Sequence, residues 1–189
     1  MAFPALFPAL LDANALWSAA FRDTVLRAAK RDMFRPLWTE QILDELARNL
    51  KAKRPDLDPA RLDRTIALMR SQFPEALVTG YEALIPAMTN HPGDRHVLAA
   101  AVRANASVIV TWNVKDFSEA ARAPYDIDLQ TPDTFLSHLW HLAPDHIVSV
   151  LKEQAAPLTK PPMTPLQVLD TLAKTLPDFA DLARNSGRF

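Results

Sequence analysis

The chain has 189 residues, 49% hydrophobic and 23% charged, which is typical of one folded domain with a modest addition. It contains no cysteine, and this excludes disulfide bonds, thiolate zinc sites and cysteine nucleophiles. With only 3 glycines it also has no glycine-rich phosphate loop or dinucleotide fingerprint, and its net charge of −1 favours no class of partner.

The apolar start, Met1 to Pro8, lacks basic residues and is interrupted by Pro4 and Pro8, so we do not expect a signal peptide. No later apolar run is long enough to cross a bilayer. These features, with the absence of cysteine, predict a cytoplasmic protein without membrane contact.

Positive charge is concentrated in residues 22–70, which hold 12 Lys and Arg against 8 Asp and Glu. This segment includes a basic group made of Arg48, Lys51, Lys53, Arg54, Arg61 and Arg64. Such a group is either an ordinary solvated helical surface or a phosphate-binding one, and the sequence favours neither.

The first part of the chain alternates short apolar runs with helix-compatible stretches. The predicted strands are 7–12, 34–39 and 76–79, and the predicted helices are 13–30, 40–50 and 60–72. Thr39 is suited to cap the second helix. Prolines and aspartates in 54–59 predict the turn before the third helix.

The same alternation continues to about residue 142. We predict a turn at 91–94, a helix at 95–105, a strand at 107–111, a weaker strand at 125–130 and a helix at 132–141. The segment Ser107-Val-Ile-Val-Thr111 is β-branched and apolar on both faces, which is typical of a buried parallel strand. The pattern predicts an α/β protein in which helices cover both faces of a central parallel sheet.

The pattern changes after residue 142. Residues 144–155 and 166–184 are helix-compatible, and the proline-rich segment 156–165 between them predicts a stiff linker. We therefore expect two parts, a core domain at 1–142 and a helical C-terminal extension at 143–189.

Four acidic residues are candidates for one shared site. In an open parallel sheet, functional groups collect beyond the carboxyl ends of the strands, where Asp12 and Asp116 are expected. Asp94 begins a helix on its buried side. In the helix 40–50, Leu43, Leu46 and Leu50 define the buried face, so that Glu45 lies at its margin and Asp44 points away.

Carboxylates that converge beside an apolar sheet repel one another and lose hydration, unless a cation is bound. Because the available ligands are oxygen atoms, Mg²⁺ or Mn²⁺ is the expected ion. The chemistry that such a site serves best is hydrolysis of a phosphodiester bond.

The chain resembles PIN-domain nucleases in four segments, in the same order and with similar spacing. They are Leu11-Asp-Ala-Asn-Ala-Leu-Trp17, Ile42-Leu-Asp-Glu-Leu-Ala47, Asp94-Arg-His-Val-Leu-Ala-Ala-Ala101 and Val110-Thr-Trp-Asn-Val-Lys-Asp-Phe117. The resemblance covers about residues 5–140, and the C-terminal helices resemble those of a longer subgroup of VapC-type toxins. It implies a three-layer α/β/α fold and a Mg²⁺- or Mn²⁺-dependent endoribonuclease.

The resemblance also implies roles for individual residues. It places Asp12, Glu45, Asp94 and Asp116 around the metal, with Asn14, Thr111 and Asn113 in support. Many members have Asp where this chain has Asn113, so one carboxylate is missing and Asp116 has to supply the fourth. The implied partners are tRNA or another structured RNA and a cognate antitoxin of a type II toxin–antitoxin module. A homodimer is a further possible assembly that the sequence does not decide.

Candidate RNA-binding residues are Arg48, Lys51, Lys53, Arg54 and Trp112. Trp112 follows a strand directly and could stack on a base, whereas Trp17, Trp38 and Trp140 are expected in the core. For His91 and His96, a surface or capping role is favoured over metal binding.

Two other functions remain as alternatives. A catalytically silent PIN fold could act as an RNA-binding or protein-interaction module. A haloacid-dehalogenase-type phosphatase would need an acid two residues after Asp12, where the chain has Asn14, so this alternative is disfavoured.

Overall fold

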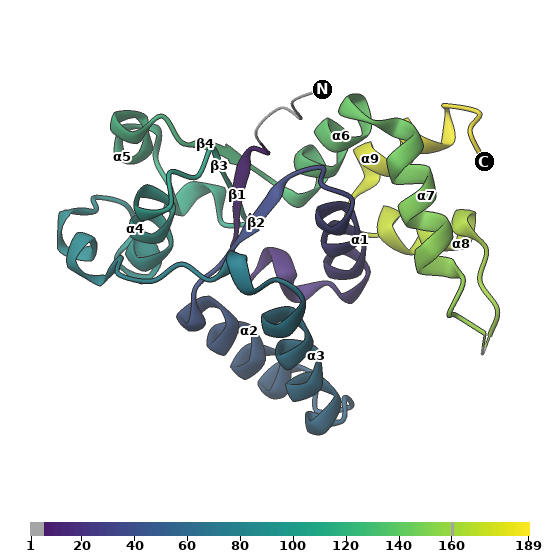
Figure 1. Ribbon diagram of the computed structural model, residues 1–189, viewed down its shortest axis with the longest axis horizontal. Helices are drawn as coiled ribbons and strands as arrows, with labels where there is room; N and C mark the ends of the chain where they lie inside the picture. The colour runs from purple at the N-terminus through teal and green to yellow at the C-terminus, as the bar shows by residue number, and fades with distance from the viewer. Residues whose placement is uncertain (1–5, 160) are drawn as a thin grey trace.

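The computed structural model describes residues 6–159 and 161–189, so residues 1–5 of the apolar start and Lys160 of the predicted linker lie outside the described residues. At its centre is a parallel sheet of four short strands in the order β2-β1-β3-β4 (Figure 1). The strands are β1 (Pro8–Leu11), β2 (Arg35–Leu37), β3 (Val108–Val110) and β4 (Asp128–Gln130). The predicted parallel α/β architecture is confirmed.

Helices surround this sheet in the described part of the chain. They are α1 (Ala19–Lys30), α2 (Glu40–Lys53), α3 (Pro59–Gln72), α4 (Arg95–Arg103), α5 (Glu119–Arg122), α6 (Pro132–Leu142), α7 (Pro144–Ala155), α8 (Pro165–Ala173) and α9 (Pro177–Arg184). In Figure 1, α4 lies on one side of the sheet and α1 with the C-terminal helices on the other, while α2 and α3 form a pair below the sheet in this view. None of the helices in 6–159 and 161–189 combines the length and apolarity needed to cross a membrane.

The two central strands explain where a site can form. Ala9, Leu10 and Leu11 in β1 and all three residues of β3 are buried, because helices cover both faces. The chain leaves β1 for β2 on one side and later returns to β3 on the other. This reversal places the carboxyl ends of β1 and β3 side by side at the usual position of a site in an open α/β sheet.

Two predicted elements were wrong in detail. Residues 76–79 form no strand. Leu77 makes a single parallel bridge with Trp38, and the chain bends at Gly80, which has a φ of 72°. The predicted helix 13–30 is divided into a 3₁₀ turn, Ala15–Trp17, and α1. Ser18 separates them because it is extended and its hydroxyl accepts a hydrogen bond from the Phe21 N–H, capping α1.

The C-terminal helices are joined to the rest of the chain by both apolar and polar contacts. Helix α7 packs on α1, and α9 packs on α6. The buried Thr24 hydroxyl of α1 donates to Gln154 Oε1 of α7 at 2.7 Å. Apolar residues of the extension, such as Leu169 and Phe179, belong to the same buried cluster as the strands. The division into two parts at residue 142 stays a prediction.

Candidate active site

Asp12 follows β1 and is only 3% exposed. Its Oδ1 accepts the Ala13 N–H at 2.7 Å, and its Oδ2 accepts the Asn14 amide at 2.7 Å and the Thr111 hydroxyl at 2.8 Å. Three donors from two neighbouring strand ends therefore fix this carboxylate in one orientation.

The electrostatic surroundings of Asp12 oppose its negative charge. Burial raises the pKa of Asp12 to about 6, and the charges of Asp94 and Glu45 raise it as well, although the hydrogen bonds from Thr111 and Ala13 act in the opposite direction. A buried carboxylate that is fixed in place and faces further negative charge is a favourable ligand for a cation.

Asp94 and Asp116 come from two turns that a backbone hydrogen bond holds together. The His91 N–H donates to the Asp116 carbonyl at 3.0 Å. One ligand atom from each of His91, Asp94 and Asp116 can be chosen so that all three lie within 4.8 Å of one another. Burial, and then the charge of Asp116, raises the pKa of Asp94. This group of three could hold a metal ion, and among the described residues neither Asp12 nor Glu45 belongs to it.

The Asp94 side chain does not cap the helix that it precedes: it makes no capping hydrogen bond to α4 within the described residues. The Asp94 carboxylate is therefore not engaged in capping α4. His91 does have the capping role that the sequence favoured, because its Nδ1 accepts the Gly93 N–H at 3.2 Å. The same nitrogen lies 3.5 Å from Asp94 Oδ2.

Glu45 and Asp44 differ as the helical periodicity predicts. The side chain of Asp44 is 72% exposed, whereas that of Glu45 is 26% exposed and lies against His96 of α4. The contact with His96 is the largest of the effects that lower the pKa of Glu45. His96 itself is buried, so its predicted surface or capping role was wrong.

Asn14 links Asp12 to the turn after β3. Its amide nitrogen donates to Asp12 Oδ2 at 2.7 Å, and its Oδ1 accepts the Trp112 N–H at 2.8 Å. The Thr111 hydroxyl in turn accepts the Asn113 N–H at 3.0 Å. These bonds hold Trp112, whose side chain is 41% exposed, beside the buried carboxylate.

The basic residues of α2 and of its C-cap, Arg54, differ in how they are paired. Lys51 forms an ion pair with Asp63, Arg54 forms one with Asp56, and Lys53 lies over the ring of Trp17. Arg48 forms no ion pair within 6–159 and 161–189, and its charge helps to lower the pKa of Glu45.

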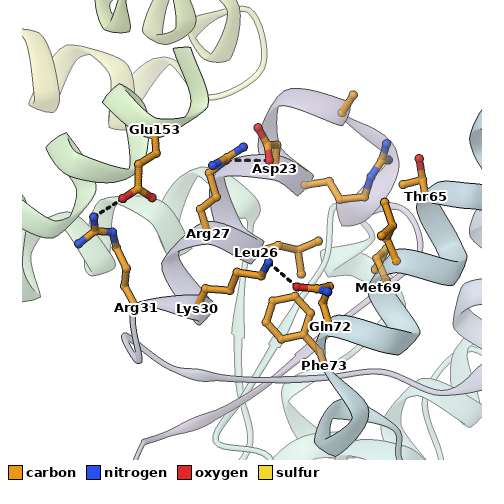
Figure 2. Close-up of a pocket in the computed structure, with 13 residues that line it drawn as sticks. Asp23, Leu26, Arg27, Lys30, Arg31, Thr65, Met69, Gln72, Phe73 and Glu153 are labelled. Carbon is orange, nitrogen blue, oxygen red and sulfur yellow. Dashed lines mark hydrogen bonds and ion pairs between the residues drawn. The ribbon is translucent and has the colours of Figure 1, made fainter. Parts of the chain in front are cut away.

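A cavity of about 780 Å³ lies away from these acids, between α1, α3 and α7 (Figure 2). Of the described residues that line it, none is Asp12, Glu45, Asp94 or Asp116. Arg27 pairs with Asp23, Arg31 pairs with Glu153, and the Lys30 ammonium donates to Gln72. Because each of these charged side chains already has a partner, the chemistry is better assigned to Asp12, Glu45, Asp94 and Asp116.

Comparison with known proteins addresses the family directly. A family model described as "PIN domain" matches residues 8–115, more than half of the chain. The chain belongs to the PIN-domain family. A second model, "VapC50 C-terminal domain", matches residues 132–185, which assigns this PIN protein to the VapC-type group with a helical C-terminal extension.

One curated relative of this PIN protein is "Putative ribonuclease VapC50" of Mycobacterium tuberculosis (strain ATCC 25618 / H37Rv). The two are 41% identical over 128 residues, which cover 66% of this chain and 76% of the relative. No solved structure matches the chain.

The sequence and the structure identify overlapping but different sets of site residues. Both bring Asp94 and Asp116 together, and the charges of Asp94 and Glu45 act on Asp12. The nearness of His91 to the two aspartates and the contact of His96 with Glu45 were not predicted from the sequence. The available signal was position: His96 lies two residues after Asp94, on the turn that begins α4.

Proposed function

We propose that this PIN protein is a Mg²⁺- or Mn²⁺-dependent endoribonuclease that acts as the toxin of a type II toxin–antitoxin module. The observation that carries the proposal is the buried Asp12 carboxylate, whose pKa is raised by burial and by the charges of Asp94 and Glu45. A divalent cation removes that electrostatic cost, and phosphodiester hydrolysis is the chemistry it serves.

The ligands of the ion would be Asp12, Glu45, Asp94 and Asp116. When bound, the ion would lower the pKa of a water molecule and neutralise charge that develops on the phosphate. Asn14 and Thr111 orient Asp12 by donating hydrogen bonds to its Oδ2. Asn113 supports the same turn, since its N–H donates to the Thr111 hydroxyl.

The RNA would be bound beside these acids. Among the basic residues of α2, Arg48 has the strongest case for a phosphate contact because its charge acts on Glu45, whereas Lys51, Lys53 and Arg54 already have partners. Trp112 would stack on a base, since its ring is exposed and its backbone is fixed next to Asp12.

A structured RNA such as tRNA is the proposed substrate class, and an antitoxin protein is the proposed inhibitor. The relative is named "Putative ribonuclease VapC50", which supports an RNA substrate and, through the VapC family, an antitoxin partner. The choice of a structured RNA rests on the resemblance alone. Adding the product of a small neighbouring reading frame should abolish cleavage if that product is the antitoxin.

The direct test is cleavage of a tRNA by the purified chain in Mn²⁺, with and without a chelator. We expect cleavage that stops on chelation and returns when Mn²⁺ is restored. The variant Asp94→Asn should be inactive and should keep the far-ultraviolet circular dichroism of the native protein. Asp44→Asn, which changes an exposed acid on α2, is the matched control and should cleave normally.

Cleavage that survives both chelation and Asp94→Asn would overturn the site assignment. RNA binding without metal-dependent cleavage would instead favour the alternative function, a catalytically silent RNA-binding PIN fold. The identity of residue 113 makes that alternative worth testing, because an amide binds Mg²⁺ less strongly than a carboxylate.

A further inference from the structure

His96 is a buried polar ring whose only charged neighbour among the described ion pairs is Glu45. The ring belongs to the first turn of α4, is 5% exposed, and places Nε2 at 3.2 Å from Glu45 Oε1. Neither ring nitrogen has a well-aligned hydrogen bond within 6–159 and 161–189. Nε2 and Oε1 are therefore in direct contact, but the geometry is not that of a standard hydrogen bond.

The surroundings of the ring indicate which nitrogen carries the hydrogen. A hydrogen on Nδ1 would be buried without an acceptor in the described residues, and an unpaired buried donor is costly. A hydrogen on Nε2 faces a carboxylate oxygen. The ring is therefore best accommodated as a donor to Glu45 through Nε2.

We propose, as an extension of the nuclease function proposed above, that His96 is a positioning residue that holds Glu45 Oε1 and keeps this carboxylate turned toward Asp12 and Asp94. A Glu at the margin of a helix is ordinarily a solvated side chain with several rotamers. The contact with a buried ring on a different helix restricts that freedom before any ion binds.

The electrostatic relations among the acids support this proposal. The charge of Glu45 contributes to the raised pKa of both Asp12 and Asp94, as the smallest of the effects on each, so the three carboxylates interact electrostatically. The contact with His96 is the main effect that lowers the pKa of Glu45, and burial opposes it. Groups that orient metal ligands in this way commonly change metal affinity 10- to 100-fold when removed.

A purely structural role for His96 makes a different prediction about stability. Leu in place of His96 removes a poorly paired polar ring from a buried position, which favours the folded state, but it also removes the contact that lowers the pKa of Glu45, which disfavours it. Positioning thus predicts that His96→Leu unfolds close to the native temperature while its metal binding weakens. A structural role predicts that both decline together.

The experiment is calorimetric titration of the full chain with Mn²⁺, which needs no RNA, followed by steady-state cleavage. We expect His96→Leu to bind Mn²⁺ about 10-fold more weakly and to lose kcat with little change in KM for RNA. His96→Gln, which keeps a side-chain N–H donor, should recover most of the affinity. Asp44→Asn is the matched control and should titrate like the native chain.

The variant Glu45→Gln distinguishes failure of the positioning role of His96 from failure of the assignment of Glu45 as a metal ligand. If Glu45→Gln weakens Mn²⁺ binding and His96→Leu does not, the positioning role is overturned and the nuclease site stands. If Glu45→Gln binds Mn²⁺ like the native chain, Glu45 is not a ligand and both assignments to it fail. A lower unfolding temperature in His96→Leu, without recovery of binding in His96→Gln, also overturns positioning. In the expected case, adding His96→Leu to Glu45→Gln weakens binding no further.

Discussion

The Thr111 hydroxyl donates to Asp12 Oδ2 at 2.8 Å, so the ends of the two central strands are joined through side chains as well as through the backbone. The Asp12 N–H also donates to the Val110 carbonyl at 3.1 Å. Because Thr111 and Asp12 are both buried, this pair fixes the carboxylate with little freedom to rotate. The orientation of the candidate metal ligand thus depends on a residue 99 positions away in the chain.

Thr111→Val tests this relationship while preserving the shape of the side chain. The change removes the donor to Asp12 and leaves the Asn113 N–H without its acceptor, so we expect a loss of about 1–3 kcal/mol in the free energy of unfolding. Mn²⁺ binding should weaken too, because Asp12 loses an orienting bond. Chemical denaturation measures the first effect and calorimetry the second.

Thr65→Val on α3 is the control for that substitution, since its hydroxyl donates to the exposed carbonyl of Arg61. It should change the free energy of unfolding by only a few tenths of a kcal/mol. Equal losses in the two variants would mean that the Thr111 hydroxyl has no special role.

The pH dependence of stability offers a second prediction, for the metal-free protein. The pKa of Asp12 is about 6 in the folded state and 3.8 for an unperturbed aspartate, which represents the unfolded state. As the pH rises, the folded state therefore keeps this proton to a higher pH than the unfolded state does. Stability is therefore lost as the pH rises from about 4 to about 6, by roughly 3 kcal/mol from this group. Urea denaturation in chelator at several pH values measures the slope.

Asp12→Asn removes this titration and should flatten the profile between the same pH values. Saturating Mn²⁺ should stabilise the native chain more at pH 7 than at pH 4, because ligand binding to the folded state adds stability and a protonated Asp12 binds the ion poorly. A native profile no steeper than that of Asp12→Asn would contradict the raised pKa.

Trp112 provides a prediction about RNA binding. If its exposed ring stacks on a base, Trp112→Ala should raise KM for RNA by about 10-fold, while Trp112→Phe should keep most of the affinity. Steady-state cleavage of a labelled RNA gives both constants. Tyr125→Ala, which removes another exposed aromatic ring, is the control, and a similar rise in KM there would argue against a specific contact at Trp112.

The parallel architecture and the relation of Glu45 to Asp44 could be predicted because both follow from hydrophobic periodicity. Periodicity also explains the error at 76–79: an apolar, β-branched run fits a strand, yet only Leu77 forms a bridge, with Trp38, before Gly80 turns the chain. A local pattern does not report whether a partner strand lies beside it.

The contacts between distant residues could not be predicted in the same way. The approach of His96 to Glu45 depends on how α4 packs relative to α2, and the proximity of His91 to Asp116 depends on a backbone hydrogen bond between two turns. Residue types and spacing do not encode these distances by themselves. The buried Asp133, which the sequence analysis did not single out, is a third case.

Asp133 joins α6 to α9. It lies in the first turn of α6, and its carboxylate accepts the Asp178 N–H at 3.1 Å and the Phe179 N–H at 2.8 Å at the start of α9. Asp133→Ala would leave both N–H donors unpaired, and the Phe179 N–H is buried. The change should therefore lower the free energy of unfolding by about 1–3 kcal/mol.

Asp178→Ala is the matched control, because Asp178 is an exposed acid in the same first turn of α9 and only its backbone N–H reaches Asp133. Its loss should cost at most about 1 kcal/mol through the helix dipole. Thermal and urea denaturation measure the free energy of unfolding of both variants. Mn²⁺ affinity should stay native in each, because neither residue is one of the four proposed metal ligands. If Asp133→Ala weakened Mn²⁺ binding without loss of stability, the extension would be linked to the site and not merely docked on the core.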